Sequence, residues 1–413
     1  MKRILSYLQS VVQAWNKSHL MLRILIGVII GAVLALACPQ LSGIAFLGTL
    51  FVGALKSIAP ILVFILVIAA VSKARQGLGS RFRMVISLYL MSTFMAAVLA
   101  VSASRLFPVN IVLTDVVSAE NAAPGALGDV FGNIISEVMS NPLKATMNAN
   151  YLSILFWAIM IGLSLKKVAA EATINFIQDM ADAVSFIVQW IIQCAPFGIM
   201  GLVFASVSES GLDIFTTYGK LLLVLVGCMA FVSVVLNPMI VGFMIRRNPY
   251  PLLWKCLKES GVSAFFTRSS AANIPVNMDL CKRMGVDEDF YSVSIPLGST
   301  INMNGAAVTI TVMTLATCNT VGITPTLASA ILLSIIATFA ACGASGVAGG
   351  SLLLIPMACS LFGISNDIAM QVVAVGFIIG VVQDSVETAL NSSGDALFTI
   401  ATDMHERIKS ANK

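Results

Sequence analysis

The last long apolar segment of the chain carries five polar residues whose spacing is suited to binding a charged solute. These residues are Asp384, Glu387, Thr388, Asn391 and Asp395. Their offsets of 3, 4, 7 and 11 from Asp384 place them on one face of a helix. A charged group at the centre of a membrane helix costs about 2.5–3.5 kcal/mol on insertion scales. Three carboxylates on one face therefore need cationic partners, and Na⁺, H⁺, a substrate ammonium group and Arg268 are the candidates.

A second polar feature interrupts another apolar segment, between Val293 and Leu315. Residues 299–306 read Ser-Thr-Ile-Asn-Met-Asn-Gly-Ala, where the flanking sequence is typical of a membrane helix. Broken backbone at membrane depth is tolerated only where it is buried in protein or lines a cavity. A broken helix offers carbonyl oxygens and amide groups to an ion or a solute. The segment therefore favours solute transport over simple membrane anchoring.

The composition indicates a polytopic protein of the lipid bilayer. The chain has 413 residues, of which 58% are hydrophobic and 11% are charged. An average soluble domain has about 25% charged residues. The net charge of +4 does not indicate nucleic-acid binding, because the basic residues follow membrane topology. No nucleic-acid partner is expected.

The hydrophobic pattern predicts the topology, because about 20 apolar residues are needed to span a bilayer. The candidate spans lie near 22–38, 44–71, 84–106, 127–165 (broken), 178–208, 214–245, 287–317 and 366–401. Two further apolar stretches, near 250–279 and 325–362, are interrupted by small residues and are predicted to be re-entrant hairpins. Basic residues concentrate in alternate loops, so the positive-inside rule places both termini in the cytoplasm. The predicted fold class is an all-α polytopic membrane protein with eight transmembrane helices and two re-entrant helical hairpins.

The second half of the chain contains a weak internal repeat. Each predicted hairpin has a tip of small residues, at 267–275 and 343–351, and each is followed by an Asn-x-x-Gly element, at 302–305 and 391–394. The topology makes the two hairpins enter the membrane from opposite sides. Inverted repeats with broken helices are the architecture of many secondary transporters. Close helix packing explains one such run of small residues, but it explains two matched pairs poorly.

Taken together, these motifs resemble the dicarboxylate/amino acid:cation symporter family over essentially the whole chain. The resemblance is densest from 266 to 395: the Thr-Arg-Ser-Ser tip, the sequence Pro-Leu-Gly-x-Thr-Ile-Asn-Met-Asn-Gly at 296–305, the Gly-rich second hairpin, and the helix from Asp384 to Asp395. Within the family, the chain is most similar to the bacterial branch that takes up serine and threonine with sodium. The resemblance implies a glutamate-transporter-like elevator fold and a homotrimer. Residues 1–80 and 109–212 would form its scaffold, and residues 81–108 and 213–413 its mobile transport domain.

The resemblance also implies roles for particular residues in substrate binding. Asp384 matches the carboxylate that holds the substrate α-ammonium group. Asn391, Ser269 and Ser270 match groups on the α-carboxylate. The gating tip spans Val347 to Gly349. The remaining substrate-binding candidates on the last span are Glu387 and Thr388.

Two sodium sites are implied in the same way. The carbonyl groups of Gly298, Asn302 and Asn391, with the carboxylate of Asp395, match the first site. Thr300, Met303 and the carbonyl groups near 341–344 match the second. Na⁺ is therefore expected as the co-transported ion.

Two departures from the family pattern bear on the substrate and the ions. Members that carry acidic substrates have Arg at the position of Glu387 and Thr at the position of Ala306. Like charges repel in a dry site, so Glu387 disfavours glutamate and aspartate, and it can accept a hydrogen bond from the hydroxyl of serine or threonine. Protonation of Glu387, its pairing with Arg268 and a cationic substrate stay open as alternatives.

The second departure is Asn304, where the family pattern has Asp. That Asp contributes charge to a third sodium site together with the positions of Tyr89, Ser92, Thr93 and Asn302. Loss of the charge predicts fewer coupled sodium ions than in the glutamate transporters.

The sequence is therefore interpreted as a sodium-coupled importer of serine and threonine in the bacterial cytoplasmic membrane. The alternatives are a proton-coupled symporter or a symporter of broader neutral amino acid range. No GxxxxGK[ST] phosphate-binding loop occurs. An intramembrane hydrolase that uses Asp384 and Asp395 is disfavoured, because 11 residues of one helix separate them by roughly 16 Å. The protein is expected to be a secondary transporter and not an enzyme.

Overall fold

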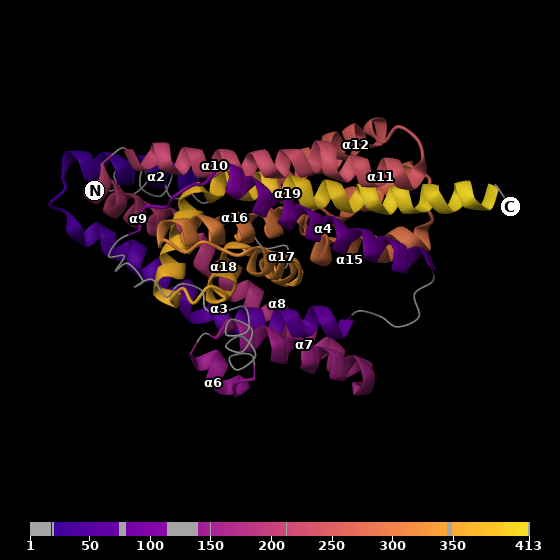
Figure 1. Ribbon diagram of the computed structural model, residues 1–413, viewed down its shortest axis with the longest axis horizontal. Helices are drawn as coiled ribbons and strands as arrows, with labels where there is room; N and C mark the ends of the chain where they lie inside the picture. Colours follow the sequence, from indigo (N-terminus) through magenta and orange to yellow (C-terminus); the bar gives the residue numbers. More distant parts are fainter. Residues whose placement is uncertain are drawn as a thin grey trace, which may run out of the picture.

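The computed structural model describes residues 18, 20–73, 80–113, 139–148, 150–211, 213–344 and 349–411. Every regular element within these ranges is a helix, so the expected all-helical class is confirmed for the described part of the chain. The helices form an elongated bundle, with most of them aligned near its long axis (Figure 1).

Three long apolar helices open the described chain. They are α2 (Leu20–Ala37), α3 (Ala45–Lys73) and α4 (Ser80–Leu106), with the short helix η1 (Ser42–Ile44) before α3. Small residues bring α2 very close to a later helix, α9 (Ala195–Ser210). A Cβ atom on Gly27 would lie 2.3 Å from the carbonyl oxygen of Pro196, and one on Gly31 would lie 2.5 Å from that of Met200. Glycine at both positions therefore permits a backbone contact that any side chain would prevent.

The next helices are α6 (Pro142–Met147), α7 (Tyr151–Val168) and α8 (Glu171–Gln193), followed by α9. The sequence predicts one span over 178–208, but α8 and α9 meet at Cys194 with a bend of 55°. Pro196 occupies the first turn of α9 and lacks a backbone N–H, so the hydrogen bonds of a straight helix cannot continue across this point. The predicted broken span 127–165 lies partly outside the described residues.

The second half begins with one continuous helical rod and a bent hairpin. The rod consists of α10 (Asp213–Phe231), the π-helical turn η2 (Val232–Leu236) and α11 (Asn237–Ile245). The first arm of the hairpin consists of α12 (Tyr250–Cys256), the π-helical turn η3 (Leu257–Gly261) and α13 (Val262–Thr267). The second arm is α14 (Ile274–Arg283), which packs back against η3. This hairpin covers the predicted stretch 250–279 and extends four residues past it.

The predicted break near residue 302 is present. Helix α15 (Glu288–Ile301) ends there, and α16 (Asn304–Thr320) begins after two non-helical residues. A second hairpin follows, with α17 (Leu327–Ala341) as its first arm and η4 (Leu352–Leu354) with α18 (Ile355–Ser360) as its second. The last helix, α19 (Asn366–Ala411), runs along the bundle and packs against α4, α10, α11, α13, α14, α15, α16 and α18 (Figure 1).

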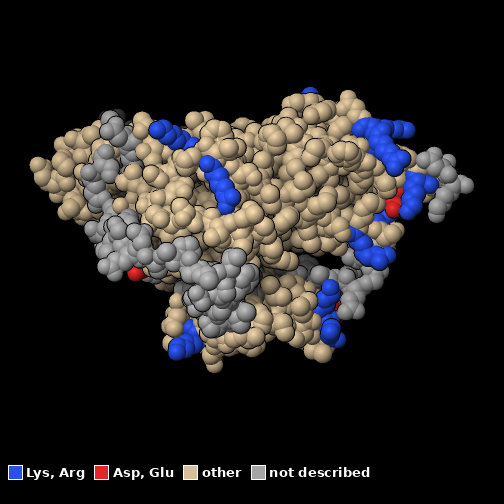
Figure 2. Space-filling view, in the orientation of Figure 1, with Lys and Arg blue, Asp and Glu red and all other residues tan. Residues whose placement is uncertain are grey.

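Five described helices are long and apolar enough to cross a membrane, judged by length and composition, and the bent pair α8–α9 makes a sixth. Lys and Arg side chains gather at the end of the bundle where α19 finishes (Figure 2). Ion pairs tie the elements together there: Arg81 at the start of α4 contacts Asp287 at 3.0 Å and the buried Asp403 of α19 at 3.7 Å.

Candidate functional site

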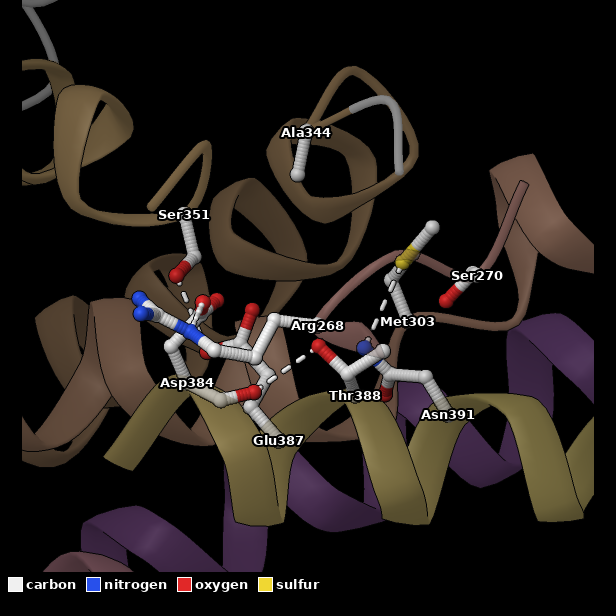
Figure 3. A pocket seen from close by; sticks show the side chains of 9 residues that line it. All are labelled: Arg268, Ser270, Met303, Ala344, Ser351, Asp384, Glu387, Thr388 and Asn391. Carbon is white, nitrogen blue, oxygen red and sulfur yellow. Dashed lines mark hydrogen bonds and ion pairs between the residues drawn. The ribbon is translucent and has the colours of Figure 1, made fainter. Parts of the chain in front are cut away.

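A small pocket lies where the two hairpin tips and the break at residue 302 approach α19. Figure 3 shows side chains from both hairpin tips, from the break and from α19 around this pocket. Its lining residues are Arg268, Ser270, Met303, Ala344, Ser351, Asp384, Glu387, Thr388 and Asn391. Six of these are predicted site residues, so the structure brings residues from separate parts of the chain into one cavity.

Helix α19 supplies the charged wall of this pocket. It is one unbroken helix of 46 residues, so the five polar residues singled out in the sequence do share a face. The carboxylates of Asp384, Glu387 and Asp395 are buried, with residue exposures of 3%, 5% and 0%. A buried carboxylate is strongly destabilising unless a cation or several donors compensate it. The three groups meet this requirement in different ways.

Asp384 is compensated by Arg268. The Nε atom of Arg268 lies 2.6 Å from Oδ2 of Asp384. Arg268 ends α13 in the left-handed region, with φ of 52°, which is uncommon for a residue other than glycine. This conformation turns the chain at the first hairpin tip, and the side chain reaches across to α19. The structure therefore contains an ion pair between Arg268 and Asp384, which the sequence offered as one way to compensate this carboxylate.

The first tip is a turn and not the start of a helix. Helix α14 begins only at Ile274, with Asn273 before it and Pro275 in its first turn. Residues 269–271 therefore form the turn that precedes the helix. Within it, Ser270 lines the pocket, whereas Ser269 is not among the lining residues and its hydroxyl accepts a hydrogen bond from the backbone N–H of Ala272.

The second tip contacts both pocket carboxylates. The backbone N–H of Gly349 donates to Oδ1 of Asp384 at 3.2 Å, and the hydroxyl of Ser351 donates to Oε2 of Glu387 at 2.9 Å. Gly349 has φ of +74°, and a Cβ atom there would lie 2.9 Å from the ring of Phe377. Glycine is therefore required at this point of the tip. Val347, the other predicted tip residue, lies outside the described residues.

Glu387 is compensated by three neutral donors. Besides Ser351, the hydroxyl of Thr309 donates to Oε2 at 2.7 Å, and the side-chain amide of Gln383 donates to the same oxygen at 2.5 Å. Arg268 is bonded to Asp384 and forms no ion pair with Glu387 in the described structure. Of the alternatives left open by the sequence, a pairing of Glu387 with Arg268 is therefore absent from the contacts of the described residues.

The residues predicted for the first sodium site lie close together. The side-chain amide of Asn302 donates to the carbonyl oxygen of Asn391 at 3.1 Å and to Oδ1 of Asp395 at 2.9 Å. A Cβ atom on Gly298 would lie 2.9 Å from the same Oδ1. The other oxygen of Asp395, Oδ2, is buried and has no hydrogen-bond partner among the residues that the structure describes. A buried carboxylate oxygen beside carbonyl groups and without a donor is suited to a hard cation, which prefers oxygen ligands.

The residues predicted for the second sodium site are less closely gathered. Met303 lines the pocket, and its sulfur accepts from the amide of Asn391 at 3.4 Å. The hydroxyl of Thr300 donates back to the carbonyl of Leu297 at 2.8 Å. The thiol of Cys342, at the end of α17, lies 3.7 Å from the carbonyl of Ile301. The second tip therefore starts directly beside the break in the α15–α16 span.

A neutral cluster surrounds Asn304, where the family pattern has Asp. The Oδ1 atom of Asn304 accepts from the hydroxyls of Ser92 at 3.1 Å and Thr93 at 2.8 Å. Its amide donates to Oδ1 of Asn237 at 3.2 Å. All four residues are nearly inaccessible to solvent. Hydrogen bonds thus satisfy the side chain of Asn304 without an ion.

Four residues of these clusters were not predicted as site residues. Gln383 and Glu387 are four positions apart, so an i,i+4 contact on the predicted helix was available as a signal. Ser351 closes the small-residue tip that the sequence analysis identified. Thr309 and Asn237 have no comparable signal, because their contacts join segments that are 78 and 67 positions apart.

Comparison with known proteins agrees with the motif-based resemblance. Residues 20–404 match the model of the sodium:dicarboxylate symporter family. The serine/threonine transporter SstT of Bifidobacterium adolescentis is 54% identical over 409 residues, which is 99% of this chain and 95% of that protein. The proteins of the same name from Streptococcus agalactiae and Enterococcus faecalis are 55% identical over 387 residues (94% and 96%) and 54% identical over 398 residues (96% and 94%). The chain therefore belongs to the sodium:dicarboxylate symporter family and is a multi-pass membrane transporter, not an enzyme.

Proposed function

We propose that this protein is a sodium-coupled importer of serine and threonine. One observation carries the proposal: the pocket holds a second buried carboxylate, Glu387, three positions after the ion-paired Asp384 on the same helix and beside neutral donors. A site of this kind repels an acidic side chain and accepts a hydroxyl. The names of the relatives, which share more than half of their residues with this chain, support the same substrates.

The pocket offers a partner for each part of such an amino acid. Asp384 would bind the α-ammonium group in place of its contact with Arg268. The amide of Asn391 and the hydroxyl of Ser270 would bind the α-carboxylate, and Glu387 would accept the side-chain hydroxyl. Thr388 donates its own hydroxyl to the backbone carbonyl of Asp384 at 2.8 Å, so its contribution is to shape the wall.

Sodium binding would organise the broken helix before the substrate binds. In the proposed first site, Na⁺ would contact Oδ2 of Asp395, which has no partner in the described structure, and carbonyl groups near Gly298, Asn302 and Asn391. Asn391 belongs to both this site and the pocket, because its backbone carbonyl lies at the proposed sodium site beside Asn302, whereas the residue itself lines the pocket. An ion that fixes Asn391 would therefore also fix one wall of the substrate pocket.

The finer architecture is proposed on the same grounds. It comprises eight spans, two re-entrant hairpins and both termini in the cytoplasm of a bacterium. The gathering of basic residues at the α19 end supports a cytoplasmic position for that end of the bundle (Figure 2). A scaffold of 1–80 and 109–212 and a mobile part of 81–108 and 213–413 is supported by packing: α3 packs on α7, α8 and α9, whereas α4 packs on α16 and α17. A homotrimer and an elevator motion are proposed from family membership.

The decisive experiment is uptake of labelled serine into proteoliposomes that contain the purified protein. We expect uptake under an inward Na⁺ gradient that is inhibited by excess threonine and unaffected by excess aspartate. Replacing Na⁺ by K⁺ should abolish it. Uptake driven by a proton gradient alone would replace sodium coupling with the proton-coupled alternative, and equal inhibition by many neutral amino acids would favour the broader substrate range.

A further prediction concerns the number of coupled ions. Asn304→Asp restores a carboxylate beside Ser92, Thr93 and Asn237, whose oxygens would then surround a negative charge. We expect the Hill coefficient for Na⁺ in serine uptake to rise, and the charge moved per serine to increase by about one. Asn319→Asp is the matched control, because it places the same charge later on α16, outside the cluster. An unchanged charge-to-serine ratio in Asn304→Asp would contradict the prediction.

A further inference from the structure

All three donors to Glu387 converge on one of its two carboxylate oxygens. Thr309, Ser351 and Gln383 all donate to Oε2, at 2.7, 2.9 and 2.5 Å. None of the described residues donates a hydrogen bond to Oε1. Because Glu387 lines the pocket, the arrangement saturates one oxygen with protein donors and leaves the other for the cavity.

The orientation of Glu387 is held from several sides. The amide of Gln383 also donates to the hydroxyl oxygen of Thr309 at 2.7 Å, which directs the hydroxyl hydrogen of Thr309 toward Glu387. A Cβ atom on Gly305 would lie 2.9 Å from the Cα and Cγ atoms of Glu387, so the stem of the side chain packs directly on the start of α16. The carboxylate is therefore fixed both along its stem and at one oxygen.

We propose that Thr309, Gln383 and Ser351 are positioning residues that build, with Oε1 of Glu387, a subsite selective for the hydroxyl of a small amino acid. This inference rests on the proposed function and deepens it, since it identifies what discriminates serine and threonine from alanine. A site built to accept a hydroxyl hydrogen bond disfavours an analogue that lacks the group, because its buried acceptor is then left unpaired.

The position of Ser351 links this selectivity to the second hairpin. Ser351 lies between the tip and η4, whereas Thr309 and Gln383 belong to α16 and α19. The hydrogen-bond set on Oε2 is thus complete only while the hairpin lies against α19, as it does in this structure (Figure 3). A substrate hydroxyl bonded to Oε1 would be recognised best when the hairpin is in this place.

The test compares serine with alanine in the same proteoliposomes. Thr309→Val removes one donor while keeping the shape of the side chain. We expect kcat/KM for serine to fall about tenfold, mainly through KM, and that for alanine to stay within about twofold. Thr309→Ser restores the hydroxyl and should recover most of the serine preference. Thr311→Val is the matched control, because Thr311 is equally buried on α16 and its hydroxyl has no partner in the described structure.

The outcomes separate this inference from the function on which it rests. Absence of Na⁺-driven serine uptake by the unaltered protein would overturn the proposed function. Normal uptake by the unaltered protein, with equal losses for serine and alanine in Thr309→Val, would overturn the positioning role alone. If Thr309→Val does not fold, Ser351→Ala decides, since it removes a donor at the hairpin without a cavity in α16. A serine-to-alanine ratio unchanged by Ser351→Ala contradicts the inference.

Discussion

Replacing Asp384 by Ala is expected to abolish Na⁺-driven serine uptake. Asp384 is 3% exposed and pairs with Arg268 at 2.6 Å, and it also accepts the backbone N–H of Gly349. Its removal takes away the group proposed to bind the substrate ammonium and leaves a guanidinium group unpaired in the pocket. Breaking a buried ion pair in this way costs about 3–5 kcal/mol of stability, and the loss of the carboxylate proposed to hold the substrate ammonium removes the main charged contact to the substrate.

The measurement is initial-rate uptake in proteoliposomes, accompanied by the thermal stabilisation that serine produces in the purified protein. Stabilisation should disappear together with uptake, which separates lost binding from lost movement. Asp367→Ala is the matched control, because Asp367 is an exposed carboxylate in the first turn of the same helix. Serine uptake at an unaltered level in Asp384→Ala would exclude Asp384 from the substrate site.

Replacing Glu387 by Arg is expected to reverse the charge preference of the pocket. The Arg side chain would face the neutral donors that now serve Oε2, and the pocket would lose its acceptor for a hydroxyl. We expect the apparent affinity for serine to fall about a hundredfold, by loss of a hydrogen bond to a charged group and by unpaired donors. Combined with Ala306→Thr, which completes the pattern of acidic-substrate members, the variant should bind aspartate.

Competition measurements test this reversal directly. Inhibition of residual serine uptake by aspartate, absent in the unaltered protein, is the expected signature of the double variant. Glu387→Gln is the isosteric control: it keeps an acceptor oxygen in the pocket and should retain measurable serine uptake without admitting aspartate. A serine affinity unchanged in Glu387→Arg would show that Glu387 does not contact the substrate, and the assignment of its subsite would then be wrong.

Local patterns in the sequence determined the secondary structure that carries the site. The helical spacing of Asp384, Glu387 and Asn391 and the interruption at Asn302 both follow from short-range rules, and both are present. Two local features were not anticipated from the sequence. The segment 178–208 bends at Cys194 because of Pro196, and α14 starts only at Ile274, because the left-handed Arg268 ends the preceding helix and a turn must follow.

Most of the residues that line the pocket could be predicted from family motifs, but these motifs did not specify how the buried charges are compensated. The sequence alone determined that three buried carboxylates share one face of a helix and therefore need partners. Only the tertiary structure decided that Asp384 pairs with Arg268 from 116 positions away. Within the described part of the chain, it also decided that Glu387 has three neutral donors and that an oxygen of Asp395 has none. The physical reason is that helical periodicity orders neighbours within one segment, whereas pairing depends on which segments the packed fold brings together.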